Sequence, residues 1–170
     1  MAKLRADLAA VAYWRSRPRQ ARDLVGSGLK YLAGGPNAAQ LHLKYGRAAV
    51  RLGDADVARR AIGQAQDARE RRNEDDLLPL GGEFAFSRAS QHYLAGSTLL
   101  EITGAERDAI AELERATEFY EAGPEEGEDH SFELRMLAQT ELAVARLRVG
   151  SSTGRSQRPG LSWPFLAVSG

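Results

Sequence analysis

Cysteine is absent from this chain of 170 residues, and histidine occurs only three times. The lack of cysteine excludes disulfides, thiolate catalysis, cysteine-ligated zinc and iron–sulfur clusters. Aromatic residues make up only 7% of the chain, and no apolar run is long enough to span a membrane. Net charge is absent too, since 23 basic and 23 acidic side chains cancel. We expect a soluble, cytoplasmic protein with no cofactor and no overall attraction to nucleic acid or a membrane.

Alanine is plentiful, with 28 residues, of which 27 precede residue 150. Apolar residues recur at spacings of three and four, and no segment keeps a period of two. Glycine and proline interrupt the pattern at intervals, as they do where helices end and restart. The sequence therefore predicts an all-α fold. We expect seven helices, at residues 2–15, 18–32, 38–52, 55–71, 87–103, 105–122 and 130–148.

Three alanines, Ala21, Ala58 and Ala109, mark an internal repeat. Each has small residues twelve and five positions before it, an aliphatic residue four positions after it and a small residue seven positions after it. In chain order these residues are Ala9, Ser16, Val25 and Gly28; Gly46, Gly53, Ile62 and Ala65; and Ser97, Gly104, Leu113 and Ala116. The pattern resembles the tetratricopeptide repeat, which is built from pairs of antiparallel helices. The resemblance implies a short right-handed solenoid over residues 2–149, and an irregular helical bundle is the alternative.

The spacing between the alanines, 37 and then 51 residues, departs from the usual 34 of this repeat. The longer interval contains a connector at residues 73–86, which we interpret as an enlarged loop. A fourth unit begins at residues 142–150 and does not continue, because 11 of the 21 residues from 150 to 170 are glycine, serine or proline. We expect an irregular tail at 150–170, for which a shifted reading frame is one explanation, and a chain that is a fragment or a degraded copy.

An incomplete last unit has a physical consequence, because a repeat stack needs a covering helix at each end. We expect an exposed apolar face around Leu137, Val144 and Leu147, which promotes self-association or partial unfolding.

Motifs for chemistry are missing. The sequence contains no phosphate-binding glycine motif, no nucleophile elbow and no pair of histidines at helical metal-ligand spacing. The acidic run at residues 125–130 lacks the spacing of a calcium loop and suits the start of a helix at Ser131 instead. We therefore expect no metal site and no enzymatic activity, and we interpret His42, His92 and His130 as structural or solvent-exposed.

Charge is balanced overall but not locally. Residues 1–72 contain 15 basic and 6 acidic side chains, whereas residues 73–149 contain 6 and 17. One interpretation is that the basic half binds an acidic ligand, peptide or nucleic-acid backbone. The other is that the two halves attract each other within one chain or between copies.

The resemblance also implies a binding surface, because the first helix of each tetratricopeptide pair lines a concave groove. The facing residues that carry the hypothesis are Tyr13, Trp14, Gln40, Arg47, Arg51 and Gln91. The same transfer includes Ala10, Leu43, Val50, Leu94, Thr98, Glu101, Ile102, Val144 and Leu147. Arg47 and Arg51 lie one turn apart and can together bind a carboxylate or phosphate. The alternative is that they are ordinary surface arginines and that Trp14 fills a gap between helices.

Several segments, among them residues 17–31, 41–44, 93–97 and 116–126, resemble the C-terminal helical-repeat region of actinobacterial XRE-type helix-turn-helix transcriptional regulators. The likeness covers residues 2–150 and contains no helix-turn-helix, so DNA would be reached only through a domain absent from this sequence. It implies a non-enzymatic sensor or interaction domain that binds a peptide, a small effector or a partner protein, with self-association as a further possibility. A stand-alone adaptor and a weak nucleic-acid binder remain the alternatives.

Overall fold

The computed structural model describes residues 2–71, 86–123 and 131–155, with side chains as far as Ser151. Within these ranges the chain forms seven α-helices and no strand, so the predicted all-α class is confirmed. The helices are α1 (Ala2–Trp14), α2 (Pro18–Leu29), α3 (Gly35–Arg51), α4 (Ala55–Glu70), α5 (Arg88–Leu100), α6 (Glu106–Ala122) and α7 (Phe132–Arg155).

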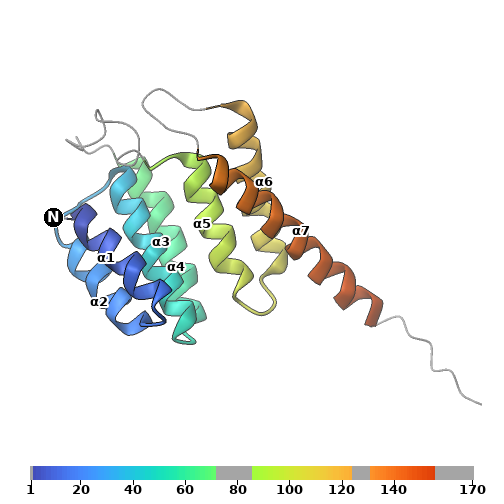
Figure 1. Cartoon of the computed structure of the whole chain (residues 1–170), viewed down its shortest axis with the longest axis horizontal. Coiled ribbons are helices and arrows are strands. Elements are labelled where there is room, and N and C mark those ends of the chain that lie inside the picture. The colour runs from blue at the N-terminus through green and yellow to red at the C-terminus, as the bar shows by residue number, and fades with distance from the viewer. Residues whose placement is uncertain (1, 72–85, 124–130, 156–170) are drawn as a thin grey trace, which may run out of the picture.

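The helices pair in chain order and the pairs lie side by side along the long axis of the molecule (Figure 1). The pairs α1–α2, α3–α4 and α5–α6 are hairpins with short turns, and α7 packs against α6 and α5. Successive odd-numbered helices also contact one another, from α1 to α3, to α5 and to α7. No comparable contact joins α2 to α4 or α4 to α6 in the described ranges. The odd-numbered helices therefore lie together on one side of the stack.

Alanine forms much of the core, as its abundance suggested. Ala9, Ala21 and Ala48 join the first hairpin to α3, and Ala116, Ala138 and Ala145 join the third hairpin to α7. Each of these residues is buried. A methyl side chain lets helix backbones approach closely, so the interior reaches a high packing density with few large residues.

Two glycines show where the helices of a hairpin meet. A Cβ atom on Gly46 would lie 3.2 Å from the carbonyl oxygen of Ala58, and one on Gly96 would lie 3.2 Å from that of Ala109. The repeat alignment paired Ala109 with Ser97, which is one residue too late. Gly46 and Ala58 are twelve positions apart, whereas Gly96 and Ala109 are thirteen apart, so the third hairpin has one more residue between its contact positions. Residues of α5 therefore align with those of α3 fifty positions earlier, not fifty-one.

The last helix is longer than expected, since α7 runs to Arg155 and not to 148. Gly53 and Gly104 turn the chain at positive φ (85° and 82°), but Gly150 at the matching position has no such turn. The helix instead continues, and the hydroxyl of Ser151 donates a hydrogen bond to the carbonyl oxygen of Leu147 (2.8 Å). Adding residues to an existing helix costs little, so serine and glycine alone do not stop it. Residues 156–170 of the expected tail, and 73–85 of the expected connector, lie outside the described residues.

Candidate functional site

A groove of about 580 Å³ runs across the odd-numbered helices. We call it the inner groove, and its size is typical of ligand-binding clefts. It is lined by Trp14 of α1, Arg47 and Arg51 of α3, Ser97 and Leu100 of α5, the turn residues Glu101–Thr103, Glu106 of α6, and Glu141, Val144 and Arg148 of α7. Residues more than 120 positions apart in the sequence thus share one surface.

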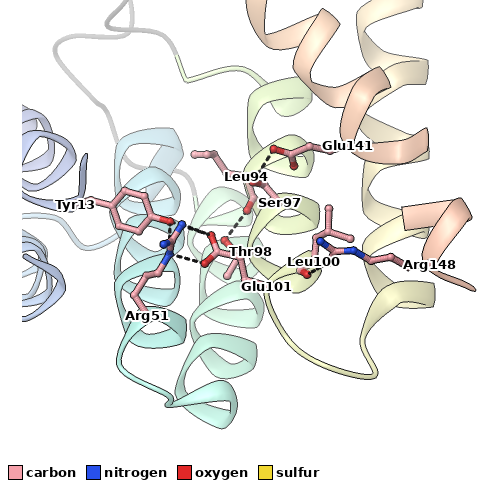
Figure 2. Close-up of polar contacts among 9 residues, drawn as sticks. All are labelled: Tyr13, Arg51, Leu94, Ser97, Thr98, Leu100, Glu101, Glu141 and Arg148. Carbon is pink, nitrogen blue, oxygen red and sulfur yellow. Dashed lines mark hydrogen bonds and ion pairs between the residues drawn. The ribbon is translucent and has the colours of Figure 1, made fainter. Parts of the chain in front are cut away.

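Arg51 is already paired. Its Nε lies 2.6 Å from Oε2 of Glu101 and also donates a hydrogen bond to the hydroxyl of Tyr13 (3.0 Å). That hydroxyl donates in turn to Oε1 of Glu101 (2.9 Å), which closes a three-membered network across α1, α3 and the end of α5 (Figure 2). The network joins the first three odd-numbered helices at one edge of the groove. Arg51 is therefore held in place by the protein's own carboxylate.

Arg47 is held by aromatic rings. Its guanidinium carbon lies 4.7 Å from the centroid of Tyr13 and 5.5 Å from a ring centroid of Trp14, and the two rings meet edge to face. Such cation–π contacts orient an arginine without neutralising its charge. Its Nε is buried and has no hydrogen-bond partner among the described residues. Arg47 thus offers the groove a positioned cation with an unused donor.

Glu141, on α7, lines the same groove as Arg47. Its Oε1 accepts hydrogen bonds from Ser97 (3.3 Å) and Tyr93 (3.4 Å), whereas its Oε2 is buried and has no partner in the part of the chain that the structure describes. Burial raises the pKa of Glu141, and hydrogen bonds from Ser97 and the charge of Arg47 partly oppose this. Burial, together with the charge of Glu141, raises the pKa of Tyr93 to about 12. The groove is therefore lined by one residue with an unsatisfied donor and by one with an unsatisfied acceptor.

Lys44 is a second desolvated charge beside this surface. It lines a small cavity of about 50 Å³ that shares Trp14 and Arg47 with the groove. Burial lowers the pKa of Lys44 to about 8, and its Nζ donates a hydrogen bond to the carbonyl oxygen of Ala6 (3.1 Å). Charges on both α3 and α7 are thus partly removed from water.

Four of the six residues predicted to line the groove lie at the inner groove or at the small cavity beside it. Trp14, Arg47 and Arg51 line the groove itself, and Tyr13 lines the cavity. Gln40 is half-buried on α3 and does not line the groove. Gln91 is wrong as a groove residue, because it is buried and accepts a hydrogen bond from Arg69 of α4.

The prediction that Thr98 lines the groove is also wrong, because Thr98, like Gln91, lies in the interior. It is fully buried and donates a hydrogen bond to the carbonyl oxygen of Leu94 (2.7 Å). Both errors follow from the extra residue in the turn of the third hairpin. With the corrected offset of fifty, Arg47 corresponds to Ser97 and Arg51 to Glu101, and both of these line the groove.

Glu141 and Arg148 were missed, although the repeat contained a signal for Arg148. Gly150 matches Gly53, so residues of α7 correspond to those of α3 ninety-seven positions earlier. Arg148 then takes the position of Arg51, and Glu141 takes that of Lys44. Arg148 donates a hydrogen bond to the carbonyl oxygen of Leu100 (2.8 Å), at the far edge of the groove (Figure 2).

Ion pairs connect the basic first half to the acidic second half. Besides Arg51 with Glu101, Arg59 of α4 lies 3.0 Å from Asp108 of α6. Attraction within the chain therefore accounts for part of the charge polarity. His92 is half-buried against Glu112 (2.7 Å) and stacks on Phe119, as a structural histidine does.

No group of three or more potential metal ligands comes together in the described ranges, and the acidic run at 125–130 lies outside them. The helices of the described part are all too short or too polar to cross a bilayer. No family model, no curated protein and no solved structure matches the chain.

Proposed function

We propose that this chain is a non-enzymatic, tetratricopeptide-like interaction or sensor domain that binds a peptide in the inner groove. The observation that carries the proposal is that two residues lining one cleft, Arg47 and Glu141, each have a side-chain atom, Nε and Oε2, that has no hydrogen-bond partner among the described residues. Buried polar atoms without partners are rare in folded proteins, and each costs about 1–3 kcal/mol. A ligand toward which the two side chains turn, and which supplies both missing partners, recovers that free energy.

The two atoms define the chemistry of the ligand. Arg47 requires a hydrogen-bond acceptor, preferably a carboxylate, and Glu141 requires a donor, preferably a cation. A peptide meets both needs when it carries an acidic and a basic group within the length of the groove. The exposed ring of Trp14, with 73% of its surface accessible, offers an apolar contact beside them.

The setting of the domain in a transcriptional regulator rests on the resemblance of its helical segments to such proteins. In that setting, ligand binding would change the contacts between odd-numbered helices, and a DNA-binding domain would respond to the change. A stand-alone adaptor would use the same groove, so the binding chemistry is common to both.

The test is selection of a phage-displayed library of random peptides on the intact chain, followed by fluorescence anisotropy with the synthetic peptides recovered. We expect saturable binding by sequences that combine acidic and basic residues. Arg47→Met and Glu141→Gln should each weaken it about tenfold or more, which corresponds to about 1.4 kcal/mol. The matched control is Arg59→Met, which removes an arginine outside the groove and should change the affinity less than about twofold.

Peptides whose affinity is the same in all three variants would contradict the proposal, as would a selection that enriches nothing. A labelled DNA duplex is the parallel probe. Salt-sensitive binding of the duplex, unaffected by Glu141→Gln, would favour the nucleic-acid alternative instead.

A further inference from the structure

Lysine is rare in this chain, and one of its lysines is largely removed from water. Only Lys3, Lys30 and Lys44 occur among the 23 basic side chains, and the others are arginines. An arginine keeps its charge in any protein environment, whereas a desolvated lysine loses its proton readily and then carries a nucleophilic nitrogen. Burial lowers the pKa of Lys44 to about 8, so this side chain combines an unusual residue type with an unusual environment.

The amine of Lys44 is held between α3 and α1. Its Nζ donates a hydrogen bond to the carbonyl oxygen of Ala6 (3.1 Å). Within the described ranges Lys44 forms no ion pair with a carboxylate. A neutral amine can maintain the bond to Ala6 with one N–H, which leaves its lone pair and a second hydrogen for reaction.

The charges around this amine favour an anion. Lys3 on α1 and Arg47 on α3 both disfavour the charged ammonium, and only Asp7 on α1 favours it. Asp7 is also within 3.5 Å of Lys3. Two cations against one carboxylate leave positive surroundings, so they would attract a negative group on Nζ of Lys44. Arg47 can also donate to such a group, because its Nε has no partner among the described residues.

Space for a small reactant lies beside the same side chain. Lys44 and Arg47 line the cavity of about 50 Å³, whose other walls are apolar or aromatic and include Tyr13, Trp14 and Leu94. A single water needs about 10–15 Å³ of such space. The cavity therefore admits a molecule of only a few non-hydrogen atoms.

Size and charge together select the reactant. An aldehyde would form an imine, which is neutral or cationic and gains nothing from neighbouring cations. An acyl donor would form a neutral amide and must bring a leaving group for which the cavity has little room. Carbon dioxide is small and apolar, and its product with a neutral amine is an anion. Among these electrophiles only carbon dioxide fits both the cavity and the charges around Lys44.

We propose that Lys44 is a site of reversible carbamate formation with carbon dioxide. The lone pair of the neutral Nζ forms a bond to the carbon of CO₂, one C=O electron pair moves to oxygen, and a proton leaves the nitrogen for water. Nothing is oxidised or reduced, and the product is the carbamate –NH–COO⁻. Its remaining N–H can still donate to Ala6, and Arg47 stabilises the new charge. The modification needs no peptide, so it does not depend on the proposed function.

The first test traps the carbamate on the intact chain. In bicarbonate buffer near pH 8, a trialkyloxonium reagent converts carbamates into stable esters, which mass spectrometry of peptides can locate. We expect modification of Lys44 at least about tenfold above that of the exposed Lys30, whose amine has an ordinary environment and is almost fully protonated at this pH. Buffer free of carbon dioxide should give no modification. Equal modification of the two lysines, or none at Lys44, would overturn the proposal.

The second test observes the carbamate without trapping. In ¹³C-labelled bicarbonate, its carbon gives a nuclear magnetic resonance signal separate from those of bicarbonate and carbon dioxide. Lys44→Arg should abolish one such signal and Lys30→Arg should retain it, with circular dichroism reporting folded protein in both. The α-amino group also reacts, and its signal should remain in both variants. A spectrum that Lys44→Arg does not change would overturn the proposal.

The third test measures the contribution of the neighbouring cation. At equal pH and carbon dioxide concentration, Arg47→Met should lower the carbamate fraction of Lys44 about threefold or more, because it removes a charge that favours both the neutral amine and the anionic product. The matched control is Arg59→Met, which removes an arginine of α4 outside the cavity and should leave the fraction unchanged. An equal fraction in the two variants would overturn the assignment, since the carbamate would then form without the charge beside it.

Discussion

The second and third hairpins share one sequence pattern and present different surfaces to the groove. In α3–α4, Gly46 contacts α4 and Arg47, its neighbour, faces the groove. In α5–α6, Gly96 takes the same place against α6 and Ser97 faces the groove. The pattern around the second helix of each pair is unchanged, so the turn alone shifts the first helix by one residue. A single extra turn residue therefore decides which side chain a ligand meets.

Thr98→Arg is the substitution with the largest expected effect on stability, and it tests the register of α5 relative to α3. If Thr98 were the counterpart of Arg47, as the alignment proposed, arginine would be tolerated there. Thr98 is instead fully buried, so the charge would lack water and a partner. We expect a loss of more than about 4 kcal/mol or failure to fold, measured by urea unfolding. The control Val144→Arg, at an exposed groove position on α7, should change stability by less than about 1 kcal/mol. Similar stabilities for the two variants would restore the original alignment.

A smaller effect compares the two contact glycines directly. A Cβ atom on Gly96 would lie 2.6 Å from Cγ of Leu113. A Cβ atom on Gly46 would lie no closer than 3.2 Å to any neighbouring atom. Gly96→Ala should therefore cost about 2–3 kcal/mol, and Gly46→Ala less than about 1 kcal/mol. Gly63→Ala is the control, because its Cβ atom would meet nothing within 4 Å, and it should stabilise the helix by about 0.5–1 kcal/mol. Equal costs at 46 and 96 would show that the close approach in α5 is relieved by movement of Leu113.

The smallest effect is the dependence of the free energy of unfolding on pH. It compares two partly buried charges at matching repeat positions, one on α3 and one on α7. Lys44 and Glu141 occupy matching repeat positions and have opposite charges. Burial lowers the pKa of Lys44 to about 8, so the folded chain loses that proton more easily than the unfolded chain, whose lysine titrates near 10.5. The contribution of Lys44 to the free energy of unfolding should therefore rise from pH 8 toward pH 10.5. Burial raises the pKa of Glu141 above 4.5, so its contribution should rise as pH falls toward 4.5.

Urea unfolding between pH 4 and pH 10 measures both contributions. Lys44→Met should flatten the alkaline rise and Glu141→Gln the acid rise, while the exposed controls Lys30→Met and Glu118→Gln should leave the profile unchanged. A profile that Glu141→Gln does not alter would mean that water reaches this carboxylate freely.

Much of the architecture was predictable from local pattern. Helical spacing and interrupting glycines located all seven helices, because these signals act within a few residues of the chain. The pattern also placed Arg47 and Arg51 on one face of a helix and anticipated the exposed residues Val144 and Leu147. Arg148 was recoverable from the offset between Gly53 and Gly150, which matches it to Arg51, whereas Glu141 was not, because its counterpart Lys44 is not among the groove residues. The α5 residues that Glu141 and Arg148 contact could not be predicted from the sequence, because those contacts depend on how α5 and α7 pack.

The sequence by itself determined the helices, their pairing and the small residues at which paired helices touch, since each depends on side-chain size and spacing along one segment. Only the tertiary structure decided that Thr98 and Gln91 are buried and that Ser97 lies at the groove. The physical reason is that successive residues of an α-helix lie about 100° apart around its axis, so a shift of one residue in register brings a different side of the helix to the groove. One residue in the turn at 101–105 was enough to exchange an interior side of α5 for its groove side.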